Sequence, residues 1–154
     1  MDIAQAIFSK LWHIWTDHRL PVALKLRLYC AGICSTFTHA CEAWCLTSEV
    51  IKKINGFNSR CLHAITRKSY RETATNPAFN LVRAVRQRRL RFLGHILRLP
   101  PDRLLRQTLF AYVMGEDSVP VGSLVDDYPG FATMEELVQL ANNRAEWADM
   151  VKNI

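Results

Sequence analysis

One stretch, residues 81–98, constrains the fold more than any other part of this 154-residue chain. It reads LVRAVRQRRLRFLGHILR, and its apolar residues recur every three or four positions, as in an amphipathic helix. These apolar residues are Leu81, Val82, Val85, Phe92, Leu93 and Ile96. At about 100° per residue, the opposite face carries Arg83, Gln87, Arg88, Arg91, His95 and Arg98. The sequence therefore predicts a helix with one buried face and one cationic face.

Arg89 falls near the middle of the predicted apolar face. A guanidinium keeps its charge in a protein, so a buried one needs an acidic partner or an opening to a ligand. Glu42 is the single charged residue between Arg27 and Glu49, within a segment rich in small and apolar side chains. We therefore expect Glu42 and Arg89 to form a buried ion pair.

Helical periodicity covers most of the chain, and no segment shows the alternation of a β-strand. The expected helices span residues 2–17, 21–46, 48–65, 77–99, 102–113 and 133–154. A segment rich in Gly, Pro and Asp, residues 114–132, predicts a linker. The expected fold is an all-α bundle of about five to six helices. It comprises a helical domain over 1–113, the linker, and a C-terminal helix over 133–154.

The net charge of +6 is spread unevenly along the chain. Residues 1–51 carry equal numbers of acidic and basic side chains, and residues 107–154 carry two basic against eight acidic. Residues 52–106 carry fourteen basic side chains against two acidic ones. Such segregation favours a polyanion-binding surface, with a solvated basic face as the alternative. His95 fits either a phosphate donor or a partly buried structural histidine.

Five cysteines and no secretory leader predict an intracellular protein, nuclear or cytoplasmic, with reduced thiols. Four of the cysteines lie with His39 in one predicted helical segment, which cannot surround a metal ion. These four are Cys30, Cys34, Cys41 and Cys45. We expect buried thiols rather than a zinc site.

No catalytic arrangement emerges from the sequence. Cys61 and His63 lie two positions apart on a predicted helix and point in different directions. Asp126 and Asp127 lie in the predicted linker, without a third carboxylate to share a metal. We therefore expect no enzyme activity, cofactor, metal or small-molecule substrate. The apolar segment of residues 28–46 is interrupted by polar residues, so we also expect no membrane span.

Three blocks, in order, resemble the region after the catalytic palm of non-LTR (LINE-like) retrotransposon reverse transcriptases. They read LPVALKLRLYCAGICSTFTHACEAWCLT, FNSRCLHAI and VRQRRLRFLGHILRLPPDRLLRQTL. That family shows a lysine-led LY-x-A-x-V-x-S-x-L run ending in G-x-E-x-W, then F-x-x-R-C-L-R, then R-R-L-R-W-x-G-H-x-x-R. The matching residues are Lys25, Leu28, Tyr29, Glu42, Trp44, Phe57, Arg60, Cys61, Leu62, Arg88, Arg89, Leu90, Arg91, Gly94, His95 and Arg98. Ala40, His63 and Phe92 stand where the family more often has glycine, arginine and tryptophan.

The resemblance covers about residues 5–113, and the tail MEELVQLANNRAEWADMV is also similar to the end of such reading frames. It implies a thumb-like helical region that grips the template–primer duplex. The family's aromatic-Ala-Asp-Asp turn is absent, so the resemblance implies a truncated element, with Met1 an internal methionine, that cannot polymerise alone.

The expected partners are the backbone of RNA, an RNA–DNA hybrid or DNA, and the missing palm domain. The expected nucleic-acid-binding residues are Arg83, Gln87, Arg88, Arg91, His95 and Arg98, extended by Arg103 and Arg106. The alternative is a structural relic or protein-interaction module with exposed apolar surface.

Overall fold

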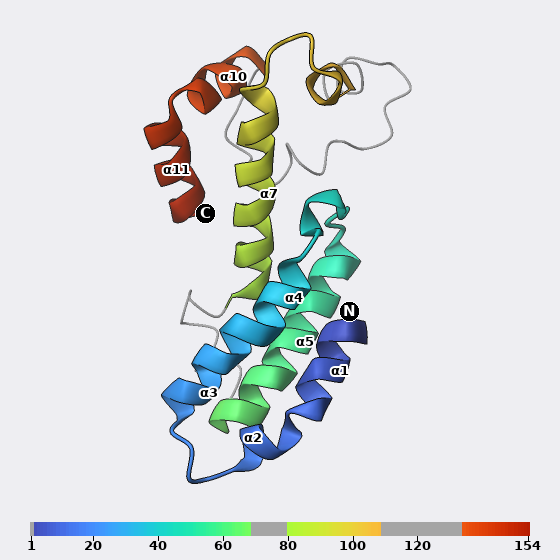
Figure 1. Cartoon of the computed structure of the whole chain (residues 1–154), viewed down its shortest axis with the longest axis vertical. Coiled ribbons are helices and arrows are strands. Elements are labelled where there is room, and N and C mark those ends of the chain that lie inside the picture. The colour runs from blue at the N-terminus through green and yellow to red at the C-terminus, as the bar shows by residue number, and fades with distance from the viewer. Residues whose placement is uncertain (1, 69–79, 109–133) are drawn as a thin grey trace. The chain divides into compact units, whose positions relative to one another are not determined.

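The structure, a computed structural model, describes residues 2–68, 80–108 and 134–154 (Figure 1). These residues form helices and no β-strand, which confirms the predicted all-α fold class. No helix in this described part is long and apolar enough to cross a membrane. The predicted linker lies outside the described residues, and the predicted helix over 102–113 is described only to residue 108.

The chain divides into two compact units. Unit 1 comprises Met1–Trp44 and Ser48–Val85, and unit 2 comprises Cys45–Thr47 and Arg86–Ile154. The boundary cuts helix α7 (Leu81–Leu97) after Val85, whereas the sequence predicts one domain over 1–113. The difference arises because the rest of α7 packs against the C-terminal segment.

Unit 1 contains a series of short helices followed by one long helix. They are α1 (Asp2–Lys10), α2 (Trp12–Thr16), α3 (Val22–Leu28), the π-helix η1 (Tyr29–Cys34), α4 (Ser35–Thr38), the 3₁₀-helix η2 (Cys41–Ala43) and α5 (Ser48–Thr66). The predicted helix over 2–17 is interrupted at Leu11, and the one over 21–46 ends early at Thr38. It ends there because the backbone of His39 is extended, and the left-handed Ala40 that follows, with φ 55°, leads into η2.

Buried polar side chains in unit 1 bond to fixed partners. The Tyr29 hydroxyl donates to Asn58 Oδ1 at 2.8 Å, which joins η1 to α5. Lys25 is 5% exposed, and its Nζ donates to the Trp15 carbonyl at 2.9 Å, at the C-terminal end of α2. Lys25, one of the residues that match the reverse-transcriptase motif, therefore stabilises a helix end.

In unit 2, α7 packs against α10 (Met134–Asn142) and α11 (Arg144–Asn153). The predicted single C-terminal helix is therefore wrong in detail, because Asn143 leaves helical geometry and its side chain accepts a bond from the Glu146 amide. The buried residues of this core are Leu90, Leu93, Ile96, Leu97, Leu137, Ala141, Trp147 and Val151.

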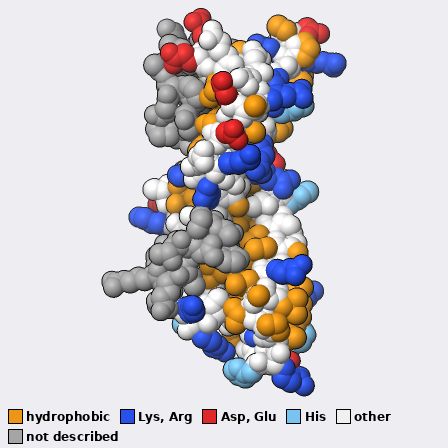
Figure 2. All heavy atoms as spheres, turned by 90° about the vertical axis from the view of Figure 1, so that its left-hand side faces the viewer, with side chains coloured by type: hydrophobic (Ala, Val, Ile, Leu, Met, Phe, Trp, Pro, Cys, Tyr) orange, Lys and Arg blue, Asp and Glu red, His pale blue; other side chains and the backbone are white. Residues whose placement is uncertain are grey.

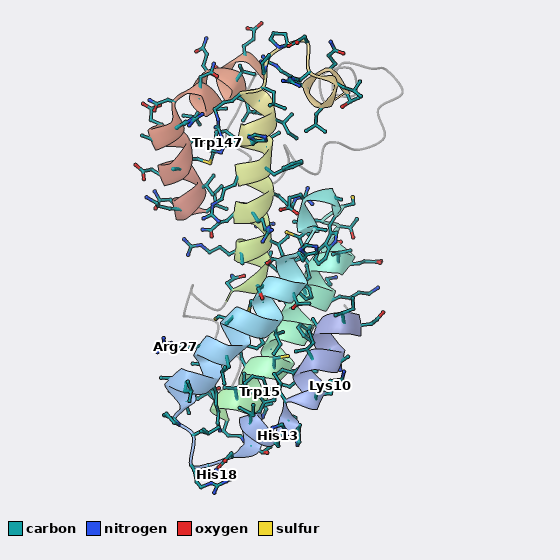
Figure 3. All side chains as sticks on the ribbon, in the orientation of Figure 1. Lys10, His13, Trp15, His18, Arg27 and Trp147 are labelled. Atoms are coloured by element: carbon teal, nitrogen blue, oxygen red, sulfur yellow. The ribbon has the colours of Figure 1, made fainter. Side chains whose placement is uncertain are left out.

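Trp147 reaches from α11 to the backbone of α7 (Figure 3). Its indole Nε1 donates to the Leu90 carbonyl at 3.2 Å in a buried position. A Cβ atom added to Gly94 would lie 2.3 Å from that nitrogen. Because Gly94 has no side chain, it leaves the space that the Trp147 indole occupies against α7.

The predicted apolar face of α7 is largely confirmed. Leu81, Val82, Val85, Leu93 and Ile96 are buried. The exception is Phe92, which is 36% exposed. Leu90 and Leu97 are fully buried instead, because the arc of α7 that α10 and α11 cover is rotated away from Phe92 relative to the predicted stripe.

Candidate nucleic-acid interface

The outer face of α7 in unit 2 carries the exposed polar side chains of Arg88, Arg91 and His95. They follow one another at i, i+3 and i+7, so they share one face over roughly 10 Å of helix axis. The half-exposed ring of Phe92 lies on the same side of the helix. This surface, the α7 cationic face, brings together three of the residues predicted to bind nucleic acid.

Two of the predicted phosphate-binding arginines instead bond to the protein backbone. Arg98 Nη1 donates to the Ala141 carbonyl at 2.8 Å, in the last turn of α10, and Arg106 Nη1 donates to the Leu99 carbonyl beyond the end of α7. Cations are favourable at the carboxyl ends of helices, where carbonyls lack partners. Burial, and to a smaller extent Arg144, lower the pKa of Arg98. Both arginines thus stabilise unit 2.

Gln87 makes a related contact at the other end of the C-terminal helix pair. Its Nε2 donates to the Lys152 carbonyl at 3.4 Å, in the last turn of α11. Arg103 is exposed after the end of α7. Arg83 is half-buried in the first turn of α7, where its amide donates to Asn80 Oδ1 at 3.0 Å. Asn80 is thus the N-terminal cap of α7.

The predicted Glu42–Arg89 pair stays a prediction. Arg89 is fully buried, as its place on the apolar face implies, and Glu42 is half-buried. The two residues belong to different units.

The cysteines differ in exposure. Cys41 and Cys61 are buried, Cys30 and Cys34 are half-buried, and Cys45 is exposed. Burial raises the pKa of both Cys34 and Cys61 to about 12, so these thiols stay protonated and unreactive at neutral pH. Within residues 2–68, 80–108 and 134–154, no three His, Cys, Asp or Glu side chains could hold a metal ion. Asp126 and Asp127 lie outside these residues.

A groove that the sequence did not reveal lies in unit 1, between α1–α2 and the C-terminal half of α5. Its volume is about 390 Å³. Its lining includes Phe8, Trp12, Phe57, Arg60, His63 and Arg67. The only hint in the sequence is the i, i+4 spacing of Phe8 and Trp12, because their basic neighbours come from a segment about fifty residues away.

Comparison with known proteins found no match to a family model, a curated protein or a solved structure. The resemblance to retrotransposon reverse transcriptases therefore depends on the three sequence blocks.

Proposed function

We propose that this chain is a nucleic-acid-binding module, a thumb-like fragment of a non-LTR retrotransposon reverse transcriptase that is not catalytic alone. The α7 cationic face carries the proposal, with the sequence blocks that resemble the family. Arg88, Arg91 and His95 are exposed on one face of a helix whose other face is anchored in a buried core. They would contact sugar-phosphate backbone, with little sequence specificity.

The distribution of charge in unit 2 favours phosphates on this face of α7 over the side that α10 and α11 cover. Helices α10 and α11 cover the opposite side of α7, and they carry exposed carboxylates. These acidic residues are Glu135, Glu136, Glu146 and Asp149. The same helices carry the exposed Arg144 and Lys152, and Lys152 pairs with Asp149 at 3.1 Å, so they remain net acidic. This net acidity favours a polyanion on the cationic side of α7. Figure 2 shows acidic side chains, with basic ones among them, on the part of the molecule that carries these helices.

Anisotropy with a labelled RNA–DNA hybrid tests this function. Affinity of the wild type should fall steeply and linearly with the logarithm of salt concentration. Replacing Arg88 and Arg91 with Glu should weaken binding and reduce the salt slope by about 2. The matched control replaces Lys52 and Lys53, both exposed on α5, with Glu, an equal change in net charge. A flat salt response, or equal weakening in both variants, would contradict the proposal.

Exposed apolar side chains on α3 support the second candidate, a protein-interaction module. Val22, Leu24 and Leu28 are 45%, 40% and 39% exposed. Figure 2 shows apolar side chains gathered over unit 1 on the face turned to the viewer. By the resemblance, the missing palm domain would be the partner. This candidate predicts association that rises with concentration in sedimentation velocity, and no more nucleic-acid binding than an unrelated protein of equal net charge.

A further inference from the structure

The groove between α1–α2 and α5 has one aromatic wall. Trp12 is 51% exposed, and its ring meets the half-buried Phe8 edge to face at 6.4 Å. Phe8 in turn stacks on Trp15 at 5.3 Å, and the Trp15 indole donates to the Phe8 carbonyl at 2.9 Å. Trp15, which is labelled in Figure 3, is itself buried. The exposed indole of Trp12 is therefore supported by a fixed aromatic cluster, as a stacking surface requires.

The opposite wall of the groove is basic. Arg60, His63 and Arg67 are all exposed, and the described lining includes no Asp or Glu. The carboxyl end of α5 contributes about half a negative charge. Two guanidiniums outweigh it, so the groove attracts anions.

The backbone at Arg67 points to a role for its side chain. Arg67 has φ 58°, a left-handed conformation in which glycine would be unstrained. Its amide donates to the His63 carbonyl at 2.8 Å, and His63 Nδ1 lies 3.0 Å from the Lys68 carbonyl, which holds this conformation. Arg67 directly follows α5, where a left-handed residue commonly ends a helix and is usually glycine. An arginine at this position places a guanidinium at the edge of the groove, at a cost in backbone strain.

We propose that this groove binds single-stranded nucleic acid, with one unstacked base against Trp12 and neighbouring phosphates on Arg60 and Arg67. Stacking on an exposed aromatic ring beside a cationic track is how sequence-tolerant single-strand binding is achieved. The groove has a volume of about 390 Å³, and stacking on Trp12 requires a base that is not stacked within a duplex. The site belongs to unit 1 and does not depend on the α7 cationic face.

The test compares a labelled oligoadenylate with a duplex of the same length, using the full chain. Trp12→Ala should weaken oligoadenylate binding by about 5- to 150-fold, the equivalent of one lost stacking contact, and leave duplex binding unchanged. Trp12→Phe, which keeps an aromatic ring, should restore most of the affinity. Binding should also quench tryptophan fluorescence in the wild type and much less in Trp12→Phe.

Arg67→Gly separates function from folding. It should raise the melting temperature by about 2–4 °C, because it relieves the left-handed backbone, yet weaken oligoadenylate binding and reduce its salt slope by about 0.7. Its matched control is Ala40→Gly, at the other described non-glycine residue with positive φ, which should raise the melting temperature and leave binding unchanged.

Two outcomes would overturn the proposal. One is oligoadenylate binding by Trp12→Ala at wild-type affinity. The other is that the Arg88→Glu, Arg91→Glu variant loses single-strand binding while the groove variants keep it. The α7 cationic face would then be the surface that binds single strands. A different pair of results would support the groove and contradict the α7 proposal. In that case duplex binding would not depend on salt, and the groove variants would bind oligoadenylate more weakly than the wild type.

Discussion

Replacing Gly94 with alanine tests how the C-terminal helices are held on α7. The new Cβ would lie 2.3 Å from Trp147 Nε1, 2.6 Å from Cε2 and 3.0 Å from Cδ1. All three atoms belong to a rigid indole that is 3% exposed, so no flexible end can swing away. Trp147 must therefore move out of its place or α11 must shift.

The magnitude follows from opposing effects on the free energy of unfolding. Alanine in a helix interior is favoured over glycine by about 1 kcal/mol. Against this, overpacking a core costs about 1–3 kcal/mol, and losing the buried bond from Trp147 to the Leu90 carbonyl costs about 1 kcal/mol more. We expect a net loss of about 1–3 kcal/mol in unit 2, because the gain from alanine roughly cancels the lost hydrogen bond and the overpacking cost remains.

Hydrogen exchange followed by mass spectrometry measures this loss separately in each unit. Exchange should accelerate in residues 134–154 and stay unchanged in α5. Gly56→Ala is the matched control, because its Cβ would meet nothing within 4 Å in the middle of α5, and it should slow exchange there. A double-mutant cycle with Trp147→Leu should show a coupling of about 1–3 kcal/mol. If Gly94→Ala stabilises unit 2 as Gly56→Ala stabilises α5, the packing argument is refuted.

The remaining predictions concern the buried groups of unit 1. Tyr29→Phe removes the bond to Asn58 and should lower the free energy of unfolding by about 1–2 kcal/mol in urea titrations, with a larger loss if Asn58 is left unsolvated. With a thiol reagent at pH 8, exposed Cys45 should react first, and Cys34 and Cys61 should react only as the chain unfolds. Burial raises the pKa of both thiols to about 12, so between pH 9 and 12 only the unfolded chain ionises them. The free energy of unfolding should therefore fall with rising pH, by at most about 1.4 kcal/mol per pH unit for each thiol; rapid labelling of Cys34 or a rise in stability would contradict this.

Helical periodicity was sufficient to predict α7 and the all-α class, because burial of one face is a property of local spacing. It failed where a partner from another segment decided the outcome. Phe92 fits the apolar spacing of α7, but α10 and α11 cover Leu90 and Leu97 instead. The break between α10 and α11 at Asn143 could have been predicted from the sequence, because an asparagine three residues before Glu146 is a helix-capping pattern.

The candidate site was predicted only in part. Arg88, Arg91 and His95 are exposed as the helical wheel requires. Arg98 bonds to a carbonyl 43 residues away, and no pattern within α7 reveals that partner. The left-handed backbone at Arg67 was equally hidden, because glycine is the residue that normally signals it.

The bond from Arg98 to Ala141 also affects how mutations in this helix should be interpreted. A chain that never binds nucleic acid would still use the donor at position 98 to hold the end of α10 against α7. Persistence of that arginine through mutational drift would therefore say nothing about ligand binding. Arg91 is the informative position, because its side chain is exposed on the α7 cationic face.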